Sequence, residues 1–300
     1  MIQITKNIRE VLDNAKLLEK GNRSPIKIRK TITGMTNDNY ICALSTGEQF
    51  IVRFPGKGTS DMINRKDEHQ NQNSIARLDL NTEVLFFDDD SGIKVTRYIE
   101  NTFVHNPSIY HKIPYVCEGL KKLHNSNTHF NNKFCFFDKI QLYETISYDL
   151  GLILCNDYLE IKTEILKHQE SLHSKMNWQP CHNDPVLENF LMDDNAHIYL
   201  IDWEYSGMND PLWDISSFAL ENSLSEDEEI YLWSCYLDDK YPTPNMLEKI
   251  KLFKICQDLL WYVWAKIKQS QGADLLDYAE MRLKRAMLNY DTIQLITTTL

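Results

Sequence analysis

The sequence predicts an α+β fold with a small β-rich N-terminal lobe and a large helical C-terminal lobe. Short β-branched runs, broken by glycine and proline, fill the first hundred residues, whereas apolar residues recur with helical spacing after Pro107. The chain has 300 residues, 43% of them hydrophobic, which is enough for two lobes and a sizeable core. We therefore expect one lobe over residues 1–100 and a helical lobe over residues 101–300.

The N-terminal lobe is expected to be a meander of strands with one inserted helix. An amphipathic helix opens the chain at about residues 5–20, and a Ser/Asp start with helical spacing predicts a second helix over residues 60–78. The expected strands cover residues 26–32, 39–47, 48–56, 83–88 and 92–100. Glycine and proline turns separate these strands, as is typical of hairpins.

The C-terminal lobe is expected to be mostly helical, with one β-like interruption. The expected helices cover residues 107–126, 136–154, 156–176, 213–222, 225–238, 245–269 and 273–290. The interruption spans residues 181–207 and contains the short strand His197–Ile201, which ends at Asp202. Its residues are the most informative of the chain.

Charge and cysteine content exclude several classes of protein. With 43 acidic and 32 basic side chains the formal net charge is −11, so no positive field favours nucleic acid. No apolar run is long enough to span a membrane. The seven cysteines form no C-x-x-C pair, and neither they nor the nine histidines show zinc-ligand spacing. We expect reduced thiols and a cytoplasmic protein, and the sequence indicates no oligomeric state.

A phosphoryl-transfer pattern lies in the β-like interruption. Residues 182–189 have the form H-x-D-x-x-x-x-N, with Asp184 as a carboxylate that orients an acceptor hydroxyl and accepts its proton. Asn189 and Asp202 supply oxygen ligands of the kind that Mg²⁺ prefers. The octet by itself is also consistent with an Asn/Asp-rich turn, but the apolar strand that ends at a second aspartate favours a site for ATP and magnesium.

The N-terminal lobe contains groups suited to a nucleotide. Small and polar residues join two strands at positions 34–39, where backbone N–H groups can approach phosphates, although an ordinary hairpin turn fits equally well. Arg53 lies in the middle of an apolar strand, where a charge is costly unless it is paired. Glu68, on the expected helix, can pair with it, as kinases pair a strand lysine with a helix glutamate. The alternatives are an edge-strand surface position for Arg53 and a solvated helix face for Glu68.

With these features assembled, the chain resembles the choline/ethanolamine kinase family, within the aminoglycoside-phosphotransferase-like group of small-molecule kinases. The closest likeness is to bacterial choline kinases, and it covers nearly the whole chain. The segments that carry it are GMTNDNY (34–40), FIVRFPGKGT (50–59), INRKDE (63–68), LKKLHNS (120–126), CHNDPVLENF (181–190), IDWEYSGMNDPLWDI (201–215) and LLWYVWAKIKQS (259–270). The resemblance implies a protein-kinase-like two-lobe fold whose N-terminal lobe binds the nucleotide.

The resemblance also implies roles for single residues. Asp184 would be the catalytic base, Asn189 and Asp202 the magnesium ligands, and Asp214 a structural brace of the catalytic loop. Arg53, paired with Glu68, would contact phosphate. The remaining nucleotide contacts would come from a turn that covers the nucleotide, with Thr36, Asn37 and Asn39, and from an adenine hinge at Thr96–Ile99, with Arg97 and Ile99.

An aromatic cluster is expected to form the acceptor site. A trimethylammonium group has no N–H to donate, so aromatic faces and carboxylates recognise it. Trp261 and Trp264 share one helix face, Tyr205 closely follows Asp202, and Glu221 follows the predicted brace by seven residues. Tyr278 matches a further aromatic of the family. Core packing is the alternative interpretation of the tryptophan pair.

The sequence thus predicts ATP-dependent, magnesium-assisted phosphorylation of choline to phosphocholine. Alternative acceptors are ethanolamine, an aminoglycoside and thiamine. A catalytically inactive kinase-like binding module is an alternative of another class, which the complete set of Asp184, Asn189 and Asp202 disfavours.

Overall fold

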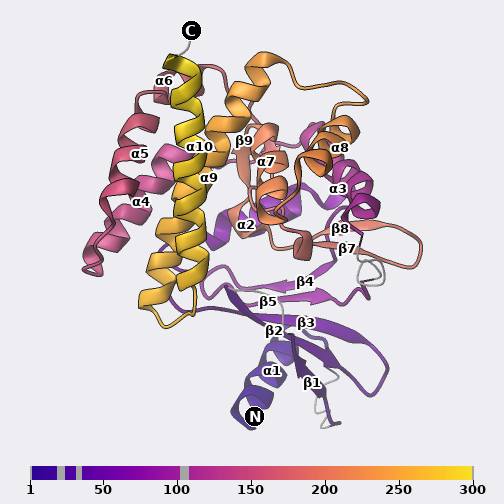
Figure 1. The fold of residues 1–300 in the computed structure, drawn as a ribbon. Coiled ribbons are helices and arrows are strands. Elements are labelled where there is room, and N and C mark those ends of the chain that lie inside the picture. Colours follow the sequence, from indigo (N-terminus) through magenta and orange to yellow (C-terminus); the bar gives the residue numbers. More distant parts are fainter. Residues whose placement is uncertain (1, 19–23, 32–35, 102–107, 299–300) are drawn as a thin grey trace. The chain divides into compact units, whose positions relative to one another are not determined.

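The chain folds into two compact units. The computed structural model describes residues 2–18, 24–31, 36–101 and 108–298, with side chains for residues 3–291. The first unit comprises Met1–Pro107 together with Glu188–Glu204, and the second comprises Ser108–Leu187 and Tyr205–Leu300. The predicted class, an antiparallel N-terminal sheet followed by a helical part, is confirmed (Figure 1). The predicted functional division at residue 100 stays a prediction.

An antiparallel five-stranded sheet forms the body of the first unit. The strands lie in the order β1-β2-β3-β5-β4, and each neighbouring pair is antiparallel. Their bounds are β1 Lys27–Lys30, β2 Asn37–Ala43, β3 Gln49–Pro55, β4 Val84–Phe87 and β5 Lys94–Arg97. Each expected strand is therefore present, and each is shorter than the sequence suggested.

A small hydrophobic core joins helix α1, Ile2–Asn14, to this sheet. Ile8, Val11 and Leu12 of α1 cluster with buried residues of β2, β3 and β5, among them Phe50. Helix α1 begins earlier than expected. It also ends earlier, because the chain adopts a left-handed conformation at Lys16, with φ of 57°.

The second helix of this unit, α2, is shorter than predicted because its caps limit it. It spans Arg65–Ser74, and the Asn64 side chain accepts hydrogen bonds from the second and third backbone N–H groups. A separate 3-10 turn follows at Ala76–Leu78. The sequence predicted one helix over residues 60–78 because the polar and apolar residues of α2 and of the 3-10 turn follow the same helical spacing.

A two-stranded hairpin from much later in the chain completes the first unit. Strands β7, Phe190–Met192, and β8, Ile198–Leu200, pair in antiparallel register. The backbone N–H of Leu200 donates to the carbonyl of Leu80 at 2.6 Å, and the ring of His197 contacts the carbonyl of Asp79 at 2.9 Å. These contacts attach the hairpin to the segment that follows α2.

Helices build the second unit, and a short strand pair lies among them. The helices are α3 Ile109–His124, α4 Phe136–Asp149, α5 Asn156–Leu166, α6 Gln169–Ser174, α7 Pro211–Glu221, α8 Glu226–Tyr236, α9 Pro244–Ser270 and α10 Leu276–Thr298. Strands β6, Gln179–Cys181, and β9, Gly207–Asn209, pair in antiparallel register. Helices α9 and α10 lie side by side along most of their length (Figure 1).

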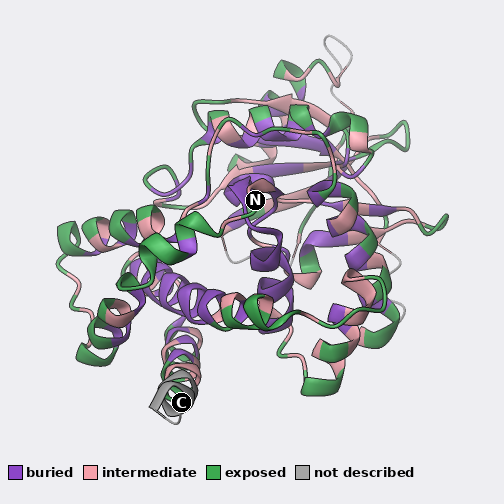
Figure 2. Cartoon of the chain, turned by 90° about the horizontal axis from the view of Figure 1, so that it is seen from above, coloured by how far each residue is buried: buried purple, intermediate pink, exposed green. Residues whose placement is uncertain are grey.

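Local capping explains where the central helices begin. The Asp210 side chain caps α7, Ser225 forms a capping box with Glu228 at the start of α8, and Thr243 caps α9 ahead of a proline at its first position. Helix α7 is buried along its whole length up to Leu220, so it forms the centre of this unit (buried residues are purple in Figure 2).

Three helix predictions of this unit differ from the structure by more than two residues at an end. The helix expected at residues 136–154 ends at Asp149. The helix expected at residues 156–176 is divided into α5 and α6, which are separated at Lys167 and His168. The helix expected at residues 273–290 starts later and continues to Thr298. Strands β6, β7 and β9 were not predicted individually, because each has only three residues and therefore too few to show alternation.

Candidate active site

The first unit contains a buried pair between a strand cation and a helix acid. Both guanidinium ends of Arg53, on β3, donate to the carboxylate of Glu68 on α2, at 2.5 and 3.0 Å. The Glu68 side chain is fully buried, and that of Arg53 is nearly so. Lys94, opposite Arg53 in the β3–β5 register, donates to the same carboxylate at 2.9 Å. The alternatives of an edge-strand surface and a solvated helix face are therefore excluded.

These cations shift the acidity of their shared partner. Burial alone would raise the pKa of Glu68, but Arg53 and Lys94 outweigh it and lower that pKa well below its usual range. Burial, and then repulsion from Arg53, lowers the pKa of Lys94. The single carboxylate of Glu68 thus pairs with two cations, Arg53 and Lys94. One negative charge does not cancel two positive charges, so β3 and β5 can still attract an anion.

A second buried carboxylate extends the cluster. Glu204 accepts hydrogen bonds from Arg65 at 2.9 Å and from the side-chain amide of Asn37 at 3.0 Å, and Arg65 also donates to Glu68 at 2.7 Å. Burial, followed by repulsion from the neighbouring Asp202, raises the pKa of Glu204 to about 7, although the nearby arginines oppose this shift. The two carboxylates and three cations form one continuous network.

The β7–β8 hairpin brings the two predicted metal ligands to one end of a strand pair. The register Phe190↔Leu200 continues into a hydrogen bond from the N–H of Ile201 to the carbonyl of Asn189 at 2.8 Å. Asn189 therefore immediately precedes one strand, and Asp202 leaves the other in a left-handed conformation with φ of 65°. Such conformations cost energy and are frequent at functional positions.

The chemistry of this hairpin end fits magnesium. An amide and a carboxylate are oxygen donors, and a small protein contribution suffices because Mg²⁺ retains waters and phosphate ligands. The Asp202 side chain is 29% exposed, and its Oδ1 lies 3.4 Å from the Arg53 guanidinium. The candidate metal ligand thus adjoins the candidate phosphate-binding cation.

The residues expected to cover the nucleotide begin strand β2. Residues 34 and 35 of the predicted turn lie outside the described residues. Thr36 precedes the strand, and its carbonyl approaches Gly56 so closely that a Cβ there would lie 1.9 Å from it. Asn37 and Asn39 lie within β2, and Asn39 is opposite Arg53 in the register. Of Thr36, Asn37 and Asn39, only Thr36 therefore lies outside the strand. That these residues contact the nucleotide stays a prediction.

The predicted adenine hinge follows β5. Arg97, the last residue of that strand, is 40% exposed and forms an ion pair with Glu83 at 2.9 Å. Ile99 lies in the segment after the strand, which has no regular structure. A hinge role for this segment stays a prediction.

In the second unit, Asp214 braces the loop that carries Asp184. Its carboxylate accepts the backbone N–H groups of His182 and Asn183 at 2.8 and 2.7 Å, as expected, and contacts the ring of His124 at 3.0 Å. Asn183 is left-handed, with φ of 69°, a conformation that asparagine tolerates better than most residues. The loop is thus fixed immediately before Asp184.

His124, Cys181 and Asp214 also place their potential ligand atoms within 4.8 Å of one another. Burial, and then the Asp214 charge, raises the pKa of the Cys181 thiol, which therefore stays protonated. Asp214 already accepts two backbone N–H groups. The described contacts of Asp214 therefore support the loop.

Four aromatic side chains of the second unit form a continuous cluster. Tyr205 contacts Trp261 with ring centroids 5.1 Å apart, Trp261 contacts Trp264 at 6.0 Å, and Trp264 contacts Tyr278 at 6.3 Å. Successive rings are inclined at 72–89°, so their faces point in different directions, as the walls of a cage do. All four predicted aromatic residues are therefore brought together.

The two tryptophans of this cluster are almost completely buried. Within the part of the chain that the structure describes, the N–H groups of Trp261 and Trp264 are buried and have no hydrogen-bond partner. Buried tryptophan N–H groups usually find one. Asp184 is among the charges that act on the pKa of Tyr278, which burial raises, so this candidate base lies near the same cluster.

The fifth predicted acceptor residue, Glu221, is held by an arginine. Arg282 of α10 donates to the Glu221 carboxylate and to the Tyr278 hydroxyl, the latter at 2.7 Å. Glu221 therefore lies at the end of the aromatic cluster, as an ion pair.

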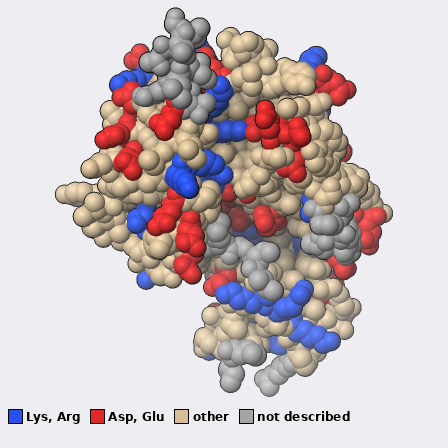
Figure 3. All heavy atoms as spheres, in the orientation of Figure 1, with Lys and Arg blue, Asp and Glu red and all other residues tan. Residues whose placement is uncertain are grey.

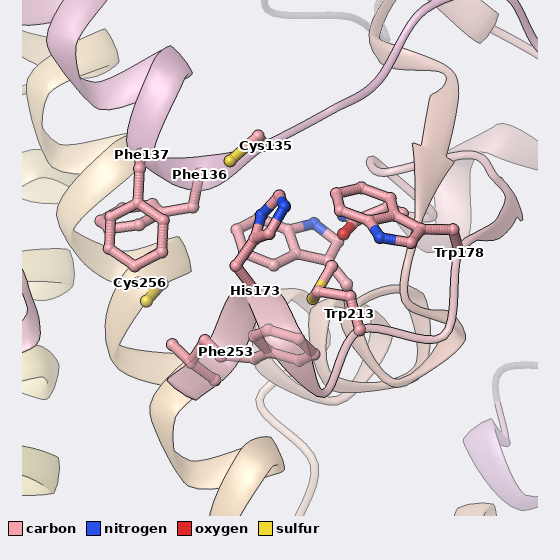
Figure 4. A pocket seen from close by; sticks show the side chains of 11 residues that line it. Cys135, Phe136, Phe137, His173, Trp178, Trp213, Phe253 and Cys256 are labelled. Atoms are coloured by element: carbon pink, nitrogen blue, oxygen red, sulfur yellow. The ribbon is translucent and has the colours of Figure 1, made fainter. Parts of the chain in front are cut away.

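An apolar pocket elsewhere in the second unit contains none of these residues. It lies between α4, α6 and α9 and is lined by aromatic, aliphatic and cysteine side chains, among them Phe136, Trp178 and Cys256 (Figure 4). Its lining contains no Asp, Glu, Lys or Arg that would orient a charged substrate. We therefore place the candidate site at the aromatic cluster and not at this pocket.

The sequence reasoning missed four charged residues: Arg65, Lys94, Glu204 and Arg282. Lys94 interrupts an apolar strand in the same way as Arg53, so the same argument would have found it. Arg282 follows Tyr278 by one helical turn, a spacing that places two side chains together. Arg65 precedes Glu68 by three residues, a helical spacing that allows an ion pair. No local pattern distinguishes Glu204, because its partners are far away in the sequence.

Together, the antiparallel sheet with its Arg–Glu pair and the helical unit with its braced H-x-D loop define a kinase-like phosphotransferase for a small molecule. The family model described as Choline/ethanolamine kinase matches residues 28–245, and the chain belongs to this family.

Individual relatives agree with this assignment. Protein LicA of Haemophilus influenzae is 34% identical over 265 residues, which cover 85% of this chain and 78% of LicA. The crystal structure of choline kinase LicA from Streptococcus pneumoniae has a TM-score of 0.83 and 32% identity, and the match covers 97% of this chain and 99% of that one. A LicA crystal structure in complex with AMP has a TM-score of 0.81 and 32% identity over 96% of this chain and 98% of that one.

The surface and the helices add two observations. On the face drawn in Figure 3, acidic and basic side chains are interspersed, and neither kind forms an unbroken field. Among the described helices, none is both long and apolar enough to cross a bilayer.

Proposed function

We propose that this kinase phosphorylates the hydroxyl group of choline with ATP as the donor. The observation that carries the choice of acceptor is the cluster of four mutually inclined aromatic rings with a carboxylate at one end. A quaternary ammonium ion is attracted to several ring faces at once and needs no hydrogen-bond acceptor. An aminoglycoside, with several ammonium groups, would instead require a wide cleft lined by carboxylates.

Asp184 is the proposed base. It accepts the proton of the acceptor hydroxyl as that oxygen attacks the γ-phosphorus, while the bond from the γ-phosphorus to the bridging oxygen breaks and ADP leaves. The braced loop fixes the position of Asp184. Arg53, oriented by Glu68, binds phosphate oxygens. Asn189 and Asp202 would hold a magnesium ion, which when bound supplies positive charge to the phosphates.

The magnesium assignment predicts a metal-dependent defect in Asp202→Asn. The variant loses one ionised oxygen donor, so the Mg²⁺ concentration that gives half-maximal activity should rise about tenfold or more, while the KM for choline changes little. The measurement is ADP release across a magnesium titration. Asp194→Asn, an exposed aspartate in the turn of the same hairpin, is the matched control. An unchanged magnesium requirement would contradict the assignment.

The cage assignment predicts different effects of two substitutions at Trp264. Leucine fills space but has no π face, so Trp264→Leu should raise the KM for choline about thirtyfold, which corresponds to a desolvated cation–π contact of about 2 kcal/mol. Trp264→Phe retains a ring and should raise it much less. The KM for ATP should not change in either variant. Equal effects of leucine and phenylalanine would indicate that Trp264 is only a packing residue.

The overall proposal is tested by ADP release with choline, ethanolamine, thiamine and kanamycin as acceptors. We expect the highest kcat/KM with choline. Preference for another acceptor would overturn the choice of substrate, and ATP consumption with none of them would favour a binding module.

A further inference from the structure

Arg282 is a fully buried cation at the end of the aromatic cluster. It is 0% exposed, and its guanidinium lies over the Tyr278 ring at 4.7 Å from the centroid. It donates to the hydroxyl of the same tyrosine, to Glu221 on α7, and to Asp258 on α9 at 3.0 Å. One side chain thus ties three acceptors from three helices together.

A second arginine balances the charge of this group. Arg285, one turn further along α10, donates twice to Asp258, at 2.9 and 2.6 Å, and once to the carbonyl of Leu220 at 3.0 Å. Two guanidinium groups therefore face two carboxylates, Asp258 and Glu221, and the group is neutral overall. Among its described contacts, Arg285 has none with Glu221 or with Tyr278.

This arrangement changes what the cluster offers to a cation. A carboxylate already paired with a buried guanidinium attracts a second cation less, and a tyrosine oxygen that accepts from arginine is less available to another donor. A primary ammonium ion must replace its hydrogen bonds to water with such acceptors, or it is left unsatisfied. A quaternary ammonium ion has no N–H to satisfy and loses nothing.

We propose that Arg282 is a positioning residue that determines acceptor specificity: by occupying Glu221 and Tyr278, it favours a quaternary ammonium alcohol over a primary one. This inference rests on the proposed function, since it concerns the same acceptor site. Aromatic faces attract both kinds of cation, and the occupied acceptors discriminate against the one that needs hydrogen bonds.

The test compares Arg282→Met with Arg285→Met. Each variant removes one of the two guanidinium groups on Asp258 and leaves the other, so both should lose stability. Only the first releases Glu221 and Tyr278. For Arg282→Met, the ratio of kcat/KM for choline to that for ethanolamine should fall about tenfold, the value of one charge-assisted hydrogen bond. For Arg285→Met the ratio should stay within about twofold, and the KM for ATP should be unchanged in both.

The outcomes separate the two proposals. If wild-type enzyme phosphorylates choline but the ratio is unchanged in Arg282→Met, or falls equally in both variants, the role of Arg282 is wrong and the proposed function stands. If wild-type enzyme uses neither acceptor, the proposed function fails, and this inference fails with it. Should Arg282→Met not fold, Arg282→Lys keeps the charge but cannot hold three acceptors with one ammonium group; its ratio should fall in the same direction, and an unchanged ratio would overturn the proposal.

Discussion

Replacing Asp184 by asparagine is expected to lower kcat about 10³-fold, within the range that a general base contributes. The amide keeps the size of the side chain but cannot accept the proton of the acceptor hydroxyl. Because Asp214 fixes the preceding backbone through His182 and Asn183, the loop should keep its conformation. The measurement is ADP release at saturating choline and ATP.

The control for this variant is Asp194→Asn, which makes the same change of charge at an exposed position. Its kcat should equal that of the wild-type enzyme. Thermal unfolding should show that Asp184→Asn remains folded. A near-normal rate in the folded Asp184→Asn variant would remove Asp184 from the mechanism.

The second large effect concerns stability. Glu68→Gln removes the buried carboxylate shared by Arg53, Lys94 and Arg65, and leaves these cations with less compensation. Breaking a buried ion pair on one side costs about 3–5 kcal/mol, so the free energy of unfolding should fall by that amount. The KM for ATP should also rise, because Arg53 loses the partner that orients it. Urea titration and ADP release measure the two effects.

The matched control is Glu83→Gln, which removes a carboxylate from the exposed ion pair with Arg97. Surface pairs contribute little, so its unfolding free energy should change by about 1 kcal/mol at most. If the free energy of unfolding of Glu68→Gln also fell by only about 1 kcal/mol, the Glu68 carboxylate would not be what stabilises the cluster of Arg53, Lys94 and Arg65.

The ion pair of Glu68 with Arg53 also predicts how the contribution of Glu68 to the free energy of unfolding depends on pH. The pKa of Glu68 is lower in the folded protein than its unfolded value of about 4.3. The stabilisation is therefore fully present above that unfolded value and is lost as the pH falls toward the folded pKa. The difference in unfolding free energy between wild type and Glu68→Gln should be constant near neutral pH and should shrink below about pH 4. A difference that grows on acidification would contradict the assigned direction.

Much of the fold could be predicted from the sequence because its elements carry local signals. The strands have β-branched runs between turn residues, and α7, α8 and α9 begin at side-chain caps. Arg53 and Glu68 could be paired because a lone charge in an apolar strand demands a partner. The boundaries were less accurate, because strands of three residues and the break after α5 leave almost no pattern.

The remaining parts of the candidate site depend on contacts between distant segments. Glu204 forms hydrogen bonds with Asn37 and Arg65, which are 167 and 139 residues away in the sequence. The periodicity of the sequence cannot predict contacts over such separations. Glu221 was predicted as a carboxylate for the substrate, and its arginine partner appears only when α7 and α10 are brought together. Glu204 was missed because tertiary packing alone decides its burial, whereas Lys94 and Arg282 carry local signals.

The composition of the first unit has a consequence for biosynthesis. Its sheet and helices come from the first 107 residues, but Glu204 and the β7–β8 hairpin come from Glu188–Glu204. A ribosome that adds about 5–20 residues per second needs on the order of 5–20 s to pass from one part to the other. During that interval the nascent sheet has Glu68 as a partner for Arg65 but lacks the second carboxylate, Glu204, so this unit reaches its final stability only after much of the helical unit has been synthesised.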